Sequence, residues 1–204
     1  MSLSSKKVFF ADYVFKVLEN VYEPAEDSFL FAENLVVSAG DVVLDVGTGC
    51  GILGIIAAEK ASKVVAVDVN PYAVRCAREN AELNGVSDRL LCVQGDLFTP
   101  IKIGEMFDLV LFNAPYLPSQ SIEDKSWLVR AWSGGVTGRQ VIDSFIREAL
   151  KYLKRDGHIF LMQSTLSNVS ETLREFEENG LKVCVVAECD LPFFETLVLV
   201  KAGR

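Results

Sequence analysis

The sequence has one histidine, five cysteines with no C-x-x-C spacing, and more acidic than basic residues. The cysteine pattern predicts neither a disulfide framework nor a zinc site, and it is typical of a reduced, cytoplasmic protein. A formal net charge of −8 argues against a protein that grips nucleic acid by itself through phosphates. The apolar run at residues 8–11 is short and ends at Asp12, so neither a signal peptide nor a membrane span is expected.

Half of the 204 residues are hydrophobic, which is enough for one domain with a sizeable core. Strand and helix patterns alternate from residue 41 to the end. The predicted strands are residues 41–46, 63–68, 90–94, 107–112, 158–162, 182–187 and 196–200, and the predicted helices are residues 52–60, 71–84, 139–153 and 167–179. This alternation predicts an α/β fold with a mostly parallel sheet covered on both faces.

The two ends of the chain depart from this alternation. The last two predicted strands are too close together for a crossover helix, so they are expected to pair as an antiparallel hairpin. Residues 1–40 are expected to form an N-terminal flap or helix that packs on the core of residues 41–204.

A glycine-rich turn follows the first predicted strand. Gly47, Gly49 and Gly51 lack side chains where a ligand would approach the backbone near a helix start. Residues 49–54 also read as G-x-G-x-x-G, and Asp68 closes the next strand at the offset of a ribose-binding acid. A nicotinamide oxidoreductase is therefore one interpretation.

Acidic residues at the strand ends favour S-adenosylmethionine over NAD. Asp45 precedes the first glycine, where it would repel a pyrophosphate but attract a sulfonium or an ammonium group. Asp96 ends the third predicted strand and can accept a hydrogen bond from an adenine amino group, while Leu97 donates through its backbone. Ligands of open α/β sheets bind at this carboxyl edge of the strands.

The fourth strand ends in Asn113-Ala114-Pro115-Tyr116, the most informative stretch of the chain. The amide oxygen of Asn113 and a main-chain carbonyl can accept both N–H bonds of a flat NH2 group, and the ring of Tyr116 can stack on its plane. A glutamine amide and the exocyclic amine of adenine both present such a group. The motif therefore predicts an N-methyltransferase and leaves the acceptor open between protein and nucleic acid.

Together with residues 21–28, 44–51 and 131–139, this motif resembles the HemK-like family of class I S-adenosylmethionine-dependent methyltransferases, whose members methylate glutamine in peptide-chain release factors. The match runs from about Tyr22 to the C-terminus. It implies a single Rossmann-like domain with a mostly parallel seven-stranded sheet that ends in an antiparallel hairpin. Bacterial members carry a separate N-terminal helical domain; without room for one, this chain resembles the short archaeal and eukaryotic branch.

The resemblance also implies roles for particular residues. At the methionine and sulfonium end, the cofactor would contact Ser28, Asn113 and Asp45 with the loop Gly47, Gly49 and Gly51. Asp68 would bind the ribose, and Asp96 and Leu97 would bind the adenine. Asn113, Pro115 and Tyr116 would be catalytic, and together with Ala114 they would hold the acceptor nitrogen. The family motif has proline where this chain has Ala114, so the fixed φ of proline is lost but the carbonyl remains.

The expected substrate is the glutamine of a Gly-Gly-Gln loop in a class I release factor, and the short branch implies a small zinc-binding activator subunit in a heterodimer. Direct nucleic-acid binding is not expected. Three alternatives stay open at this point: an adenine amino methyltransferase acting on DNA or RNA, the nicotinamide oxidoreductase, and a non-catalytic scaffold that binds the cofactor.

Overall fold

The computed structural model describes residues 5–119 and 126–204, and its centre is a seven-stranded sheet. The strand order is β5-β4-β3-β6-β7-β9-β8. These strands are β3 (Val42–Val46), β4 (Lys63–Asp68), β5 (Leu90–Gln94), β6 (Phe107–Asn113), β7 (Leu153–Ser164), β8 (Lys182–Leu191) and β9 (Glu195–Gly203). The fold class predicted from the sequence is confirmed.

The pairing of the strands explains why one edge of the sheet carries the ligand site. β3 to β7 pair in parallel, so their carboxyl ends meet at one edge. β9 runs antiparallel to both β7 and β8, as expected for the C-terminal hairpin. The chain order reverses between β3 and β6, which is the switch point where open α/β sheets bind their ligands.

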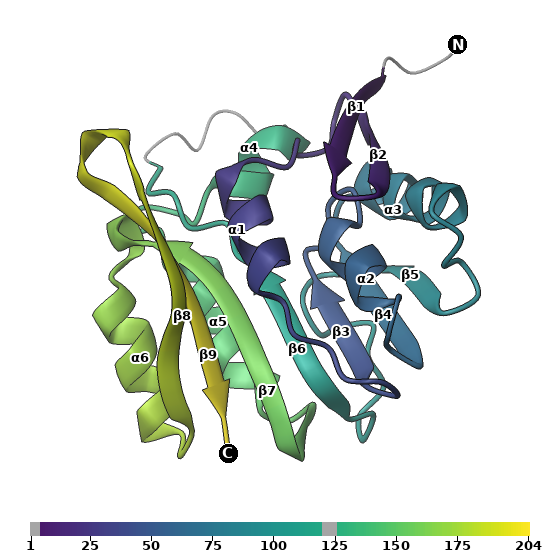
Figure 1. Cartoon of the computed structure of the whole chain (residues 1–204). Coiled ribbons are helices and arrows are strands. Elements are labelled where there is room, and N and C mark those ends of the chain that lie inside the picture. Colours follow the sequence, from purple (N-terminus) through teal and green to yellow (C-terminus); the bar gives the residue numbers. More distant parts are fainter. Residues whose placement is uncertain (1–4, 120–125) are drawn as a thin grey trace.

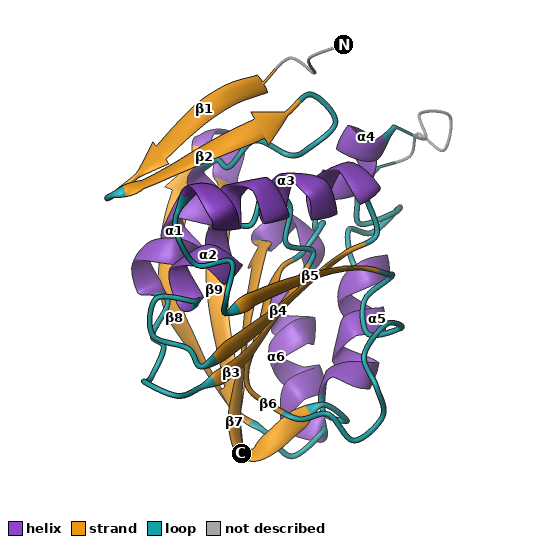
Figure 2. Ribbon diagram, turned by 90° about the vertical axis from the view of Figure 1, so that its right-hand side faces the viewer, coloured by secondary structure: helices purple, strands orange, loops and turns teal. Residues whose placement is uncertain are grey.

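Helices cover both faces of the sheet (Figures 1 and 2). One face carries α1 (Glu26–Asn34), α2 (Ile52–Ala57) and α3 (Pro71–Leu83), and the other carries α5 (Gln140–Ala149) and α6 (Val169–Glu178). α3 begins where its sequence predicts, because Asn70 caps the helix by accepting a hydrogen bond from the Tyr72 amide at 2.9 Å, and Pro71 occupies the first turn. No helix in the described ranges is long and apolar enough to cross a membrane.

The N-terminal segment contains a strand pair that the sequence did not predict. β1 (Ser5–Phe10) and β2 (Tyr13–Leu18) form an antiparallel hairpin above α3 (Figure 1), followed by α1. The side chains of Asn80 and Asn84 on α3 fasten β2 by bonding the backbone of Lys16 and Val14. Residues 1–4 of the predicted flap lie outside the described residues, and the boundary at residue 40 stays a prediction.

Several boundaries differ from those expected. α2 and α5 end at Ala57 and Ala149, earlier than predicted, and a short helix α4 (Trp127–Trp132) was not anticipated. β7 begins at Leu153 rather than near Gly157, because Leu153 already pairs with Phe107 before a bulge in the register. Leu153, which the sequence pattern assigned to the end of the helix, therefore belongs to the strand instead.

Candidate active site

A cavity of about 750 Å³ opens at the carboxyl edge of β3 to β6. Its volume lies within the range of small-molecule and cofactor sites. Ten of the predicted site residues line it: Ser28, Gly47, Gly49, Asp68, Asp96, Leu97, Asn113, Ala114, Pro115 and Tyr116. Trp127 and Trp132 of α4 line it as well. Two predicted residues, Asp45 and Gly51, are not part of the lining.

Asp68 at the end of β4 is held in place by the glycine loop. One carboxylate oxygen accepts the Gly49 amide at 2.9 Å, and the other accepts the Asn70 amide at 2.8 Å. Gly49 has φ +58°, a left-handed conformation that a residue with a side chain rarely adopts. Burial raises the pKa of Asp68, while these backbone bonds oppose the shift. The carboxylate is therefore rigid and faces the cavity with acceptor capacity to spare.

Asp45 lies beneath the loop instead of in the cavity. Its Oδ2 accepts the Thr48 hydroxyl at 2.6 Å and the Gly54 amide at 2.9 Å, and the residue is 1% exposed. Burial raises its pKa to about 7, against the opposing effect of these two hydrogen bonds. Asp45 thus holds the glycine loop from beneath, and the expected direct contact with the methionine end of the cofactor is not available to it at this position.

Gly51 allows the glycine-rich loop to pack against α3. A Cβ at this position would stand 3.1 Å from the Cβ of Ala77 on α3, so the missing side chain lets the loop sit close to that helix. At the end of β5, Asp96 is exposed and Leu97 is half-buried, and both face the cavity. Leu97 has φ +46°, which turns the chain sharply at the cavity wall.

The amide of Asn113 has a defined orientation. Its nitrogen donates to Asp27 Oδ2 at 3.1 Å and to the Ser28 hydroxyl at 3.3 Å. A carboxylate only accepts hydrogen bonds, so the NH2 side of the amide must face Asp27. The other end, Asn113 Oδ1, is buried and has no hydrogen-bond partner in the described part of the chain. A buried acceptor left open in this way is suited to an N–H donor brought by a ligand.

Asp27 is the centre of this cluster, and sequence reasoning did not single it out. It is buried at the start of α1, where the helix dipole favours a negative charge. The Tyr22 hydroxyl lies 3.2 Å from one of its oxygens and 3.3 Å from the other. Burial and the charge of Asp27 raise the pKa values of Tyr22 and Tyr116, so both phenols are neutral in the physiological range. The one sequence signal was its place in residues 21–28, within the family pattern.

The segment of residues 131–139 braces the Asn113–Tyr116 loop from outside. Leu117 exchanges hydrogen bonds with the backbone of Trp132 and Gly134, both at 2.9 Å. A Cβ on Gly134 would stand 2.6 Å from the Pro115 carbonyl oxygen, and one on Gly138 would stand 2.3 Å from that of Tyr116. Only glycine permits such close approach, which explains why this stretch is so specific a motif.

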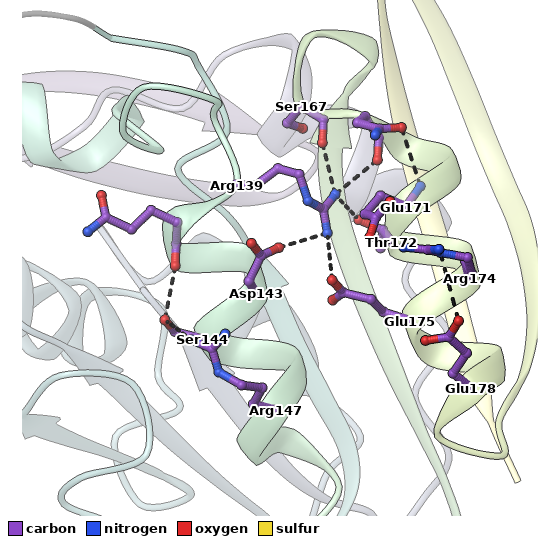
Figure 3. Close-up of polar contacts among 12 residues, drawn as sticks. Arg139, Asp143, Ser144, Arg147, Ser167, Glu171, Thr172, Arg174, Glu175 and Glu178 are labelled. Atoms are coloured by element: carbon purple, nitrogen blue, oxygen red, sulfur yellow. Dashed lines mark hydrogen bonds and ion pairs between the residues drawn. The ribbon is translucent and has the colours of Figure 1, made fainter.

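Arg139 anchors the bracing segment to the start of the neighbouring helix α6 (Figure 3). Its guanidinium donates to the carbonyls of Ser167 and Asn168 and to the Thr172 hydroxyl, each at 2.9 Å, and pairs with Asp143 at 2.8 Å. The loop of residues 113–116 is thus held by the bracing segment, which the hydrogen bonds and the ion pair of the buried Arg139 fix in turn.

The charges of the cavity bear on its ligand. Among the described lining residues, the charged ones are Asp27, Asp68, Asp96 and Arg130, and Arg130 lies over the ring of Trp127 at 5.1 Å from its centroid. Three carboxylates would repel a dinucleotide pyrophosphate and attract a sulfonium or an ammonium group. The cavity therefore fits S-adenosylmethionine better than NAD.

Comparisons with known proteins agree with this geometry. A sequence model of the ribosomal protein L11 methyltransferase (PrmA) family matches residues 26–115. Over 186 residues the chain is 42% identical to a Methanocaldococcus jannaschii protein named "putative protein N5-glutamine methyltransferase", covering 90% of this chain and 92% of that protein. The chain belongs to the HemK-like family of protein glutamine methyltransferases.

Two further relatives support the assignment of this HemK-like chain. It is 31% identical to the human methyltransferase HEMK2, over 80% of each protein. Among solved structures it is similar to the Encephalitozoon cuniculi Mtq2–Trm112 complex, which methylates the eRF1 translation termination factor. That likeness has a TM-score of 0.70 and 26% identity, and it covers 91% of this chain and 99% of the matched one. The family and the fold imply S-adenosylmethionine as the methyl donor.

Proposed function

We propose that this chain methylates the side-chain amide nitrogen of a glutamine, in the Gly-Gly-Gln loop of a class I release factor. The observation that carries the proposal is the buried Oδ1 of Asn113, which has no hydrogen-bond partner among residues 5–119 and 126–204 and whose orientation the carboxylate of Asp27 imposes. The release-factor methyltransferases among its relatives, such as that of Aquifex aeolicus at 33% identity over 72% of this chain, support the choice of substrate.

The chemistry assigned to these residues is positioning. An amide nitrogen is a poor nucleophile because its lone pair is delocalised. Hydrogen bonds from its two N–H groups to Asn113 Oδ1 and to a carbonyl of the loop would fix the angle of attack and shift electron density onto nitrogen. S-adenosylmethionine supplies an activated methyl group, so no strong base is required beside the acceptor.

We assign the remaining predicted residues to the cofactor. Asp68 would accept the ribose hydroxyls, Asp96 and Leu97 would hold the adenine, and Ser28 would cover the methionine part. The loop of residues 47–51 would lie along the cofactor, with Asp45 acting from beneath it. The locations of these residues along one cavity support the assignment.

A small zinc-binding activator subunit is proposed as the partner, with the heterodimer acting in the cytoplasm. The Mtq2–Trm112 complex supports it. β5 is an edge strand that pairs on one side with β4, and Leu91 on it is 54% exposed. An edge strand with exposed apolar side chains is a common site for addition of a partner strand.

Adenine in DNA or RNA is the second candidate acceptor, because its amino group fits the same cluster. The described cavity lining speaks against it, since Arg130 is its one basic residue and is engaged with Trp127. Phosphate binding normally needs several lysines or arginines.

The Asn113→Ala variant tests the proposed acceptor site. We expect loss of methyl transfer with S-adenosylmethionine affinity kept within a few-fold, because the amide faces the acceptor. Turnover and calorimetric affinity would be measured together, with Asn179→Ala on the exposed end of α6 as the matched control. Near-normal methylation by Asn113→Ala would remove the assignment.

A further inference from the structure

Two phenylalanines project from the turn between β8 and β9. Phe193 and Phe194 in the short helix η2 (Pro192–Phe194) are 95% and 102% exposed. Both have φ +66°, a left-handed conformation that is a genuine outlier for a bulky side chain. The backbone of the turn is thus strained at two successive residues, and the exposed rings gain no packing in return. Such strain is typical of functional segments.

This turn lies at the same edge of the sheet as the acceptor loop. Asn113 pairs with Met162 on β7, and Met162 pairs with Leu199 on β9, so the three residues form one row across the sheet. Phe194 precedes Leu199 by five residues, so it lies at most about 17 Å from this row along the direction of β9. Two strand spacings, about 10 Å, separate β9 from β6 across the sheet. Figure 1 shows the turn projecting at the upper edge, where α4 also lies.

A hydrogen bond holds the base of the turn against a neighbouring segment. The Thr196 amide donates to the Thr165 hydroxyl at 3.1 Å, which ties the turn to η1 (Thr165–Ser167). Leu166 in that segment is 47% exposed and extends the apolar surface. Burial, the charges of Asp27 and Tyr22 and, to a smaller extent, the charge of Glu195 raise the pKa of Tyr116, so the base of the turn lies within electrostatic range of the cavity wall.

The surroundings of the turn are acidic. Residues 183–200 contain Glu188, Asp190 and Glu195 and no lysine or arginine. An apolar tip flanked along its own hairpin by negative charges complements a surface that is apolar at its centre and basic at its rim.

We propose that the Phe193–Phe194 turn docks the folded domain of the protein substrate that carries the acceptor glutamine. The inference rests on the proposed function and adds to it a contact outside the catalytic cavity. Exposed aromatic side chains beside an active site supply binding energy by insertion into a pocket of the partner. The turn would select for a glutamine presented by a folded, basic protein over one in a free peptide.

The test compares the double variant Phe193→Asn/Phe194→Asn with the wild-type chain, both with the activator subunit. Asparagine adopts the left-handed conformation more readily than phenylalanine, so the fold should be kept, as a thermal melt will show. We expect KM for an intact class I release factor to rise about tenfold or more, with kcat within about twofold, because two interface aromatics are lost. KM for a short Gly-Gly-Gln peptide should not change.

The matched control is Val36→Asn, which removes a side chain that is 72% exposed from the loop after α1. An unchanged KM for the intact factor in the double variant would overturn the docking proposal while leaving the proposed function in place. Absence of release-factor methylation by the wild-type chain would overturn the proposed function, and the docking with it. A lower molecular mass of the double variant in light scattering would assign the turn to a second copy of this chain and also reject the proposal.

Discussion

The Asp27→Ala substitution tests whether the Asn113 amide, which we propose binds the acceptor, depends for its orientation on the carboxylate behind it. Asp27 Oδ2 accepts the Asn113 amide nitrogen at 3.1 Å, and no other carboxylate bonds that nitrogen among the described residues. Without Asp27, Asn113 can turn its NH2 group toward the acceptor, where it would oppose another N–H donor. Catalysis would then require the amide to be reoriented in each turnover.

The size of the effect follows from the bond that is lost. A hydrogen bond to a charged group contributes about 1.5–3 kcal/mol. If that energy is needed in the transition state, kcat falls about 10- to 100-fold, since about 1.4 kcal/mol corresponds to a factor of ten. The affinity for S-adenosylmethionine should fall as well, because Asp27 is one of the cavity carboxylates and its Oδ1 accepts the Ser28 amide at 2.6 Å and the Ser28 hydroxyl at 3.1 Å, so kcat is compared at saturating cofactor.

Steady-state kinetics of methyl transfer provide the assay, with cofactor affinity from calorimetry and folding from a thermal melt. Asp27→Asn retains the volume and one acceptor oxygen, so its kcat should lie between those of Asp27→Ala and the wild type. Glu26→Gln is the matched control, because Glu26 is the exposed neighbour in the same helical turn. A folded Asp27→Ala variant with kcat within about twofold of the wild type would refute the reasoning.

Three further variants test other parts of the account. Asp68→Ala should weaken S-adenosylmethionine binding by about 1–3 kcal/mol in calorimetry, through loss of charge-assisted hydrogen bonds, and an unchanged Kd would contradict the ribose assignment. Ala114→Pro should keep activity, because it removes only the hydrogen bond from the Ala114 amide to the Met162 carbonyl, which is long at 3.3 Å. Complete loss of activity would show that the loop needs a backbone conformation that proline cannot adopt. Asp45 has a folded pKa of about 7, above the ordinary value of 3.8, so the folded state binds the extra proton and the free energy of unfolding should decrease as pH rises from about 4 to 7. In denaturant titrations, Asp45→Asn should reduce the change in the free energy of unfolding between pH 4 and pH 7 by on the order of 2–4 kcal/mol. An unaltered pH dependence would exclude Asp45 as its source.

Much of the fold followed from local patterns in the sequence. β4 and β5 have the predicted bounds because their apolar runs end at Asp68 and Gln94, next to turn or helix-capping residues. The N-terminal hairpin was not predicted, because its turn at Ala11 adopts φ +48° without glycine or asparagine to mark it. The end of α5 was also misjudged, since a helical pattern gives no sign that Leu153 will pair with a distant strand.

In the candidate site too, some residues could be predicted from the sequence and others could not. Residues that follow strands, such as Asp68, Asp96 and Asn113, could be placed at one edge from topology alone. Asp27 could not, because its role depends on a contact with Asn113 across 86 positions of the sequence. The burial of Asp45 was equally hidden, since a carboxylate before a glycine loop looks the same whether it faces the ligand or the core.

The most direct test of the central claim is to locate the transferred methyl group. The chain would be incubated with the proposed activator subunit, labelled S-adenosylmethionine and a class I release factor, and the products analysed by mass spectrometry. The account predicts one added methyl group on the glutamine of the Gly-Gly-Gln loop, and none when that glutamine is replaced by asparagine. Methylation of adenine in naked DNA by the lone chain, with no label on the release factor, would contradict it.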